Sequence, residues 1–243
     1  KVNLTRYTLK EILSDEWDTD TIVDYSNHEI EKMYSIPSSK NSSLGVATGC
    51  NFSLSHKMIP SHKLHVVYYN FPEIGKLSSK ITKSCSDKIY NLYKSEYFNR
   101  EDSVFIIIND SITESVEKTI NELNIMLQTD FKELEISSDI IDEMKLNDFP
   151  LEKKHFSNVH IFNIDSLTNN LLEHRLVPKH NQIRKKKDIK DILEKCNCSI
   201  NQLPIILKKD AVAKLIRLTP GDLCEIKRTS IKCGEYSFYR VCT

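Results

Sequence analysis

Histidine and cysteine side chains are the residues of this chain with the most obvious chemical potential, because imidazole and thiolate bind metal ions. The histidines gather in two places, at His56, His62 and His65 and at His174 and His180. Pro178 and the β-branched residue before it favour an extended chain, in which His174 and His180 would lie about 20 Å apart. We therefore predict no shared metal ion, and expect these histidines to be polar edge or interface residues.

Seven cysteines are scattered along the chain, at Cys50, Cys85, Cys196, Cys198, Cys224, Cys233 and Cys242. Only one residue separates Cys196 from Cys198, whereas paired zinc ligands are usually two to four residues apart. An odd number of cysteines without a regular spacing is typical of reduced thiols in a protein that is not secreted. We predict core thiols, including Cys196 on the apolar face of a helix, with no metal and no cofactor.

Carboxylates next to lysines suggest a Mg²⁺-dependent nuclease as one alternative. The relevant residues are Glu143 and Lys145, Glu225 and Lys227, and Asp102 and Asp110 on either side of an apolar run. Metal-assisted cleavage needs carboxylates that converge from strand ends. Neither Glu-x-Lys triplet lies in a convincing strand of the first part of the chain, and 28% charged residues produce such triplets by chance. The chain also lacks phosphate-loop and nucleophile-elbow motifs, so we do not predict an enzyme.

Charge divides the chain into two parts. Residues 1–173 carry 18 Lys and Arg against 27 Asp and Glu, and residues 174–243 carry 16 against 7. The formal net charge of zero is thus the sum of an acidic part at about −9 and a basic part at about +9. Such asymmetry predicts two domains with different partners. The basic run at 184–187 is a solvated helix start, a phosphate-binding patch or a site for an acidic protein surface.

Residues 1–173 show the alternation expected of an α/β domain. Helices are predicted at 4–16 and 27–34, followed by a Ser- and Asn-rich exposed loop at 36–55. A strand at 64–69, a helix with Ile81, Cys85 and Ile89 on one face, and a strand at 104–108 that is apolar on both faces come next. Ser111 and Glu114 fit a capping box that starts another helix, and a strand follows at 159–164.

Residues 174–243 predict a small α+β domain. A helix carries Ile189 and Ile192 on its apolar face, and a short strand follows at 204–207. Asp210 is expected to cap a helical turn over 211–217. Pro220 and Gly221 suit a type II turn, and a terminal hairpin is expected from strands at 223–228 and 236–241.

Several short blocks in this second part occur in one order with characteristic spacing. They are His174-x-Leu-Val-Pro-Lys-His180, Gln202-Leu-Pro204, Asp210-x-Val-Ala-Lys214, Gly221-Asp222, Ile226-x-Arg228-x-Ser230 and Gly234-x-Tyr236-x-x-Tyr-Arg240. Together they resemble the C-terminal assembly domain of the fifth subunit shared by eukaryotic nuclear RNA polymerases, a domain that is similar to a small subunit of archaeal RNA polymerases. Ala211 and Lys214 stand where that family usually has Pro and Arg, which predicts weaker assembly through this turn.

The resemblance implies a non-catalytic structural subunit of a DNA-directed RNA polymerase. Residues 1–173 would form a jaw-like α/β domain with a nuclease-like layout but no active site, and residues 174–243 would form the assembly domain. The partners implied are the largest subunit, other polymerase subunits and, for the jaw, downstream duplex DNA facing Thr113 and Ser115. No membrane partner is expected. Localisation would be nuclear in a cellular member and in the virion or infected-cell cytoplasm in a viral one.

The resemblance also supplies candidate interface residues, some of which must belong to the core. They are Leu176, Val177, Pro178, Gln202, Leu203, Pro204, Asp210, Gly221, Arg228, Tyr236, Tyr239 and Arg240. Tyr and Arg are favoured as anchors because they combine large contact area with hydrogen bonding. A free-standing nucleic-acid-binding adaptor that uses the basic part alone is the alternative function.

Overall fold

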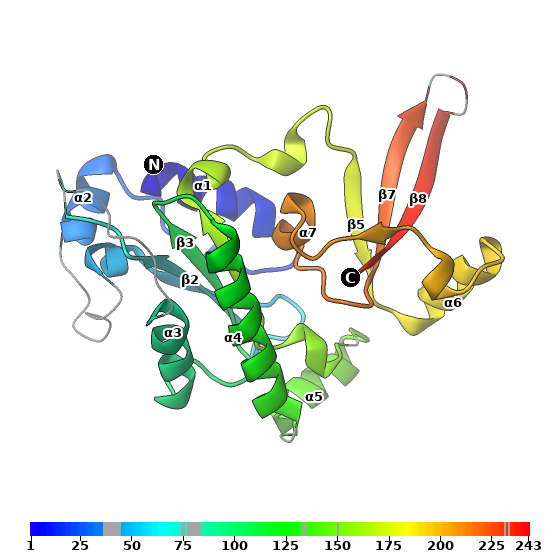
Figure 1. The fold of residues 1–243 in the computed structure, drawn as a ribbon, viewed down its shortest axis with the longest axis horizontal. Coiled ribbons are helices and arrows are strands. Elements are labelled where there is room, and N and C mark those ends of the chain that lie inside the picture. Colours follow the sequence, from blue (N-terminus) through cyan, green and yellow to red (C-terminus); the bar gives the residue numbers. More distant parts are fainter. Residues whose placement is uncertain are drawn as a thin grey trace. The chain divides into compact units, whose positions relative to one another are not determined.

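A computed structural model describes residues 1–35, 45–73, 76, 84–132, 135–149, 151–230, 232 and 234–243. The chain divides into two compact units, residues 1–147 with 155–169 and residues 148–154 with 170–243. Figure 1 shows the helices and strands of both units. The division into domains after residue 173 stays a prediction, because compactness alone does not show that either segment folds independently.

The first unit is built on a four-stranded sheet in the order β1-β2-β3-β4. Its strands are β1 (Phe52–Ser55), β2 (Lys63–Tyr69), β3 (Ser103–Ile108) and β4 (Val159–Asn163). β1 runs antiparallel to β2, whereas β2, β3 and β4 are parallel. Every residue of β3 is buried. The apolar run at 104–108 therefore forms the central strand that its composition predicted, because a strand between two layers of helices is covered on both faces.

Helices cover both faces of this sheet. α3 (Ser84–Lys94) and α4 (Glu114–Lys132) lie on one face and α1 (Val2–Leu13) on the other, and the unit also contains α2 (Asn27–Ser35) and α5 (Ser138–Leu146). Ile89 of α3 and Leu123 of α4 pack with Val67 of β2 in one apolar core. The neighbouring residue Tyr68 points to the opposite face, where its hydroxyl lies 2.9 Å from that of Thr5 in α1. The first unit is therefore α/β, as the sequence predicted.

Two details of the first unit differ from expectation. The exposed loop predicted at 36–55 is wrong for residues 46–55, which form the 3-10 helix η2 (Val46–Cys50) and the edge strand β1, with Cys50 fully buried. Residues 36–44 and Ile81 lie outside the described residues. The helix α5 was not predicted. Within the described part of the chain, no helix is long and apolar enough to cross a bilayer.

The cap of α4 is also corrected. The proposed capping box of Ser111 and Glu114 is not formed, because the helix begins at Glu114 itself. Thr113 provides the side-chain cap instead, with its Oγ1 accepting from the Val116 amide at 3.4 Å. The amide of Ser111 donates to Asp110 Oδ1 at 2.7 Å. The cap therefore lies two residues later than the sequence pattern predicted.

The second unit has a mixed four-stranded sheet in the order β5-β7-β8-β6. Its elements are β5 (Lys179–Ile183), α6 (Lys186–Lys195), β6 (Ile205–Ile206), α7 (Ala211–Leu215), β7 (Leu223–Ser230) and β8 (Gly234–Cys242), with 3-10 helices η5 (Leu171–Glu173) and η6 (Ile200–Gln202). β7 is antiparallel to both neighbours, and β6 runs parallel to β8. The predicted α+β unit with a terminal hairpin is confirmed (Figure 1).

Two local predictions in this unit are confirmed. Asp210 Oδ1 accepts from the amides of Val212 at 2.9 Å and Ala213 at 3.3 Å, which caps α7. Gly221 has a φ of +86°, and the Asp222 amide donates to the Thr219 carbonyl at 2.9 Å. This is the geometry of a type II turn, whose third position requires a positive φ and therefore favours glycine.

The segment from His174 to His180 departs from the extended path that Pro178 predicts. The Val177 amide donates to the His174 carbonyl at 2.7 Å, so the chain turns before Pro178. The following residues form β5, which pairs with β7 along its full length. The pairing was not visible in the sequence because β5 is polar, with no residue of it fully buried.

Candidate protein interface

One face of the β7–β8 hairpin presents a cluster of arginine and aromatic side chains. Arg228 lies opposite Tyr236 in the ladder, and Phe238 and Arg240 follow on the same face because side chains alternate along a strand. The guanidinium carbons of Arg228 and Arg240 lie 5.6 Å and 5.2 Å from the centre of the Phe238 ring. We call these four residues the arginine–aromatic face.

The arginine–aromatic face is held in place by the fold. Arg240 Nη1 donates to the Ile205 carbonyl at 2.7 Å, which ties β8 to β6. Each guanidinium–ring contact at an exposed site contributes about 0.5–1 kcal/mol. Tyr236 remains 42% exposed. Such a prearranged surface loses little side-chain freedom on binding and offers an aromatic contact next to donors that match carboxylates.

Arg228, Tyr236 and Arg240 were predicted from the sequence as interface residues, whereas Phe238 was not. The signal was the spacing, because Phe238 stands two residues from both Tyr236 and Arg240 and so shares their face. The same alternation separates Tyr239 from them. Tyr239 lies opposite Glu225 on the other face of the hairpin, together with the side chains that pack against α6.

Glu225 is the polar centre of that other face. Burial acts to raise the pKa of its carboxyl, but hydrogen bonds from Ser237 at 2.7 Å and Asn181 at 3.1 Å, with the charge of Lys227, outweigh burial and lower the pKa. Because Asn181 belongs to β5 and Ser237 to β8, the carboxylate joins three strands. Glu225 and Lys227, one of the two Glu-x-Lys pairs, therefore belong to a row of polar side chains that crosses the sheet.

Most of the other predicted interface residues have roles in folding. The side chain of Gln202 accepts from the amide and hydroxyl of Ser199 at 2.8 Å and 3.1 Å, closing a capping box. Leu203 is buried in the core, and the carbonyl of Pro204 accepts from the Val241 amide at 2.9 Å. Asp210 and Gly221 form the cap and turn described above. These blocks are thus explained by the local structure that they produce.

The turn at 174–178 is the other exposed part of the predicted interface. Leu176 is 75% exposed, and Val177 and Pro178 are half-buried. Its histidines are occupied by local hydrogen bonds, since His174 Nδ1 accepts from the Leu176 amide at 3.3 Å and His180 Nδ1 lies 2.6 Å from the Pro178 carbonyl. The turn therefore presents an apolar side chain, with both histidines engaged in its own backbone.

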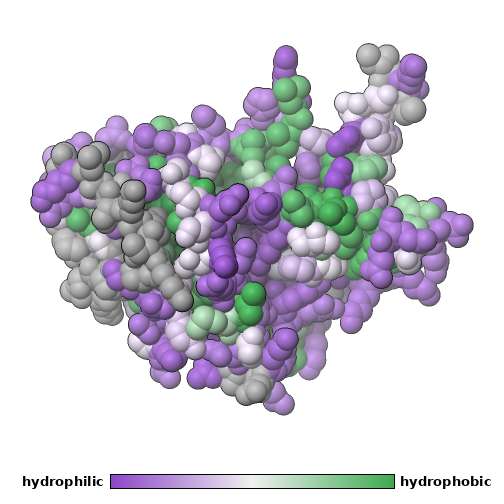
Figure 2. All heavy atoms as spheres, in the orientation of Figure 1, coloured by the Kyte–Doolittle hydropathy of each residue, from purple (hydrophilic) through white to green (hydrophobic). Residues whose placement is uncertain are grey.

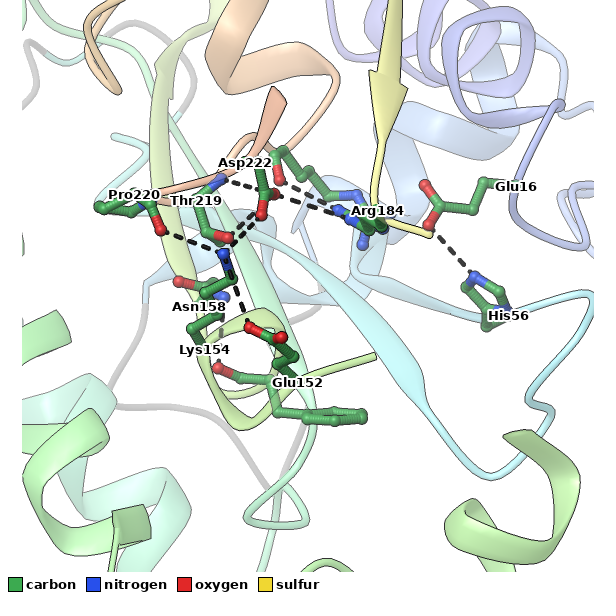
Figure 3. Close-up of polar contacts among 11 residues, drawn as sticks. Glu16, His56, Glu152, Lys154, Asn158, Arg184, Thr219, Pro220 and Asp222 are labelled. Carbon is green, nitrogen blue, oxygen red and sulfur yellow. Dashed lines mark hydrogen bonds and ion pairs between the residues drawn. The ribbon is translucent and has the colours of Figure 1, made fainter. Parts of the chain in front are cut away.

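A buried carboxylate, Asp222, organises the turn that leads into β7 (Figure 3). Its Oδ2 accepts from the Thr219 amide at 3.1 Å and the Thr219 hydroxyl at 3.0 Å. Lys154 Nζ lies 2.9 Å from Oδ1, and Arg184 Nε lies 3.7 Å from Oδ2. Lys154 also donates to the Pro220 carbonyl at 3.2 Å. These contacts join the segment 148–154 to the rest of the second unit, and they were not predicted because Lys154 is distant in the chain.

The basic run at 184–187 is largely paired within the second unit. Arg184 is only 8% exposed in its side chain, beside Asp222, so its prediction as a solvated residue is wrong. Lys185 lies 2.9 Å from Asp148, and Lys186 lies 3.7 Å from Glu152. These carboxylates lower the positive charge of the basic run, but such exposed pairs are weak and leave the two lysines open to another anion.

The residues predicted to face DNA lie at the N-terminus of α4. Thr113 and Ser115 are both exposed, and the Thr113 hydroxyl is engaged as the helix cap. Glu114 and Glu117 stand in the first turn. Free amides at a helix N-terminus attract phosphate, whereas these carboxylates repel it.

The carboxylates that were named for a possible nuclease site do not lie together in the structure. Asp102 precedes β3 and Asp110 follows it, so strand length separates them by about 25 Å. Asp102 is buried and accepts from His65 at 2.9 Å and from the Lys63 amide at 3.1 Å. Glu143 binds the amide and hydroxyl of Ser61. These carboxylates have structural partners in different parts of the unit.

Among the residues that the structure describes, no group of three or more His, Cys, Asp or Glu side chains has the geometry of a metal site. Four cysteines are buried as predicted, namely Cys50, Cys85, Cys224 and Cys242. Burial raises the pKa of the Cys224 thiol to about 12 and that of Cys242 to about 11. The prediction for Cys196 is wrong, because it follows α6 and is exposed. Cys233 lies outside the described residues.

The second unit is similar in sequence to a family of known proteins. Residues 169–242 match the family described as RNA polymerase Rpb5, C-terminal domain. The subunit Rpo5 of DNA-directed RNA polymerase from Pyrococcus horikoshii is 42% identical over 72 residues, which are 30% of this chain and 87% of the relative. The chain belongs to the Rpb5 family. The Rpo5 subunit from Archaeoglobus fulgidus is 39% identical over 71 residues, 29% of this chain and 92% of the relative.

The residues that match the Rpb5 family include the short sequence blocks described above and the structures that these blocks form. The match includes the Asp210 cap, the Gly221 turn and the whole β7–β8 hairpin with the arginine–aromatic face. The recognition made from the ordered blocks in the sequence is therefore confirmed. The segment 148–154, which contributes Lys154 to the Asp222 cluster, lies before the matched region.

Proposed function

We propose that this Rpb5-family chain is a non-catalytic structural subunit of a multisubunit DNA-directed RNA polymerase, with no active site of its own. The observation that carries the proposal is the match of residues 169–242 to the Rpb5 C-terminal domain and to archaeal polymerase subunits over nearly their whole length. The other polymerase subunits are its partners. The carboxylates considered for catalysis, such as Asp102 and Glu143, are engaged in hydrogen bonds within the fold, which supports a structural role rather than a catalytic one.

The second unit docks on the largest polymerase subunit through the arginine–aromatic face and the turn that presents Leu176. Tyr236 and the two arginines combine contact area with charged donors, the composition that dominates binding energy in protein interfaces. The exposed Leu176 adds an apolar contact. Some of the predicted anchors, including Leu203 and Tyr239, act inside this unit and support the surface from behind.

The first unit serves as a jaw beside downstream duplex DNA. Its α/β sheet with helices on both faces is compatible with the nuclease-like layout expected of such a jaw. Thr113 and Ser115 are the DNA-facing residues in this proposal, and the nearby carboxylates keep any contact weak and independent of sequence. The complex acts in the nucleus of a cellular source, or in the virion or infected-cell cytoplasm of a viral one.

Affinity purification of the tagged full-length chain from its native source tests the proposal. Wild-type protein is expected to bring down the largest polymerase subunits. Tyr236→Ala is expected to reduce their recovery several-fold, since truncation of an interface anchor costs about 1–2 kcal/mol or more. Tyr97→Ala is the matched control, because Tyr97 is 45% exposed but lies in the first unit.

Absence of large polymerase subunits from the wild-type purification would refute the function. Equal recovery with Tyr236→Ala and Tyr97→Ala would leave the polymerase assignment intact and refute docking through the arginine–aromatic face. Binding of duplex DNA to the free chain is measured separately by salt titration, because phosphate contacts weaken steeply with salt.

A further inference from the structure

The second unit has an apolar groove on the side of its sheet opposite the arginine–aromatic face. The groove lies between α6 and the loop at 197–202, and Ile189, Leu193 and Cys198 line it. All three are only partly buried, and they pack against the core formed by Ile192, Leu203 and Leu223. An apolar side chain placed in the groove would therefore extend this core.

The walls of the groove are fixed before anything binds. Asn197 has a φ of +47°, and the Cys198 amide donates to the Leu193 carbonyl at 3.1 Å, which ends α6 in a left-handed cap. The capping box of Ser199 and Gln202 then holds the second wall. A binding partner would not have to order this loop, which lowers the cost of association.

Two lysines and one glutamate, Glu194, form the charged rim of the groove, which therefore carries a net positive charge. Lys186 and Lys190 line it, and their carboxylate partners Glu152 and Glu194 lie at long distances of 3.7 Å with all four side chains more than half exposed. Such pairs hold their lysines weakly. In Figure 2 the surface around α6 is mainly hydrophilic, with a smaller hydrophobic area within it.

We propose that this groove docks a short amphipathic acidic segment of another protein, with apolar side chains on Leu193 and Ile189 and carboxylates facing Lys190 and Lys186. Apolar anchors in a groove with flanking charges are a recurrent mode of peptide recognition. The basic balance of residues 174–243 selects an acidic partner over a basic one. This site is separate from the face proposed to dock on the polymerase, so either one can fail without the other.

The test uses the full chain and a fluorescent synthetic peptide with leucines at helical spacing and glutamates between them. Anisotropy should show saturable binding that is lost when the leucines are replaced by serines. Lys190→Glu should weaken binding by about fivefold, because it replaces the attraction of one exposed lysine by the repulsion of a carboxylate. Lys187→Glu is the matched control, because it makes the same charge change on α6 outside the groove.

Thiol alkylation provides a second readout at the groove itself. Bound peptide should slow the reaction of Cys198, which lines the groove, and leave the exposed Cys196 unchanged. Three results would overturn the proposal: no peptide binding, equal loss in Lys187→Glu and Lys190→Glu, or equal binding of the serine peptide. Duplex DNA that binds in place of the peptide, and is lost in Lys190→Glu, would also overturn it.

Discussion

Replacement of Asp222 by asparagine removes the charge at the centre of the second unit with little change in shape. The carboxylate is almost fully buried and accepts from both the amide and the hydroxyl of Thr219. It also lies next to the cations of Lys154 and Arg184. Asp222→Asn leaves two positive charges beside a neutral amide, so the variant tests whether this ion cluster stabilises the unit.

The expected loss follows from the burial of the partners. Removal of one member of a buried ion pair costs about 3–5 kcal/mol, because the other charge stays buried without compensation. Lys154 is about one third exposed and can turn toward water, whereas the Arg184 side chain is 8% exposed. The carbonyl oxygen of asparagine can still accept from both the amide and the hydroxyl of Thr219, because both reach the same oxygen of Asp222. We therefore expect a loss of about 3 kcal/mol, at the lower end of that range.

Pulsed alkylation in urea measures this loss in the second unit alone. Cys224 and Cys242 are buried there, and burial raises their pKa values to about 12 and about 11. Both thiols should react only when the unit opens, so their labelling by mass spectrometry reports its unfolding. Cys50 and Cys85 are buried in the first unit and report on that unit in the same experiment.

Asp148→Asn is the matched control for the buried charge. Asp148 pairs with Lys185 at 2.9 Å, but its side chain is 91% exposed. An exposed pair contributes about 0–1 kcal/mol, so this variant should hardly shift the labelling midpoint. The same small shift for Asp222→Asn and Asp148→Asn would refute the structural role assigned to the Asp222 cluster.

Three further predictions concern the second unit. Iodoacetamide should label Cys196 rapidly in the native chain and leave Cys224 unlabelled, as peptide mass spectrometry can show; rapid native labelling of Cys224 would contradict its burial. Because the folded pKa of Glu225 lies below its ordinary value of 4.5, its stabilisation is present above that value and is lost as pH falls through the folded pKa. Glu225→Gln should therefore flatten the acid limb of the unit's stability curve, and an unchanged acid limb would contradict the role of the carboxylate. Asp210→Ala should lower the free energy of unfolding by about 1 kcal/mol through loss of the cap of α7, measured by urea unfolding with Asp210→Asn as the conservative control.

The sequence predicted correctly those elements that are determined by residues close together in the chain. The buried strand β3, the Asp210 cap and the Gly221 turn each depend on residues within a few positions of one another. Spacing of apolar residues likewise predicted α3 and α6. The prediction of the α4 cap was wrong because Ser111 and Thr113 both fit an N-cap, and the local backbone path decided between them.

Contacts between distant segments were not visible in the sequence. β5 is polar and becomes a strand only because β7 supplies its hydrogen bonds. The sequence predicted Arg184 to be solvated within a basic run, but its guanidinium lies beside Asp222 and donates to the Arg217 carbonyl. In the candidate interface, the register of the hairpin shows which face each side chain of β8 lies on. Tyr239 lies on the face opposite Tyr236, and Phe238 lies on the same face as Tyr236.

A cryo-electron microscopy map of the polymerase purified through this chain tests the central claim most directly. The account predicts density for residues 170–243 in the enzyme, with the arginine–aromatic face against the largest subunit and Tyr236 covered. An enzyme that lacks this chain, or a map in which Tyr236 and Arg228 face solvent, would contradict it.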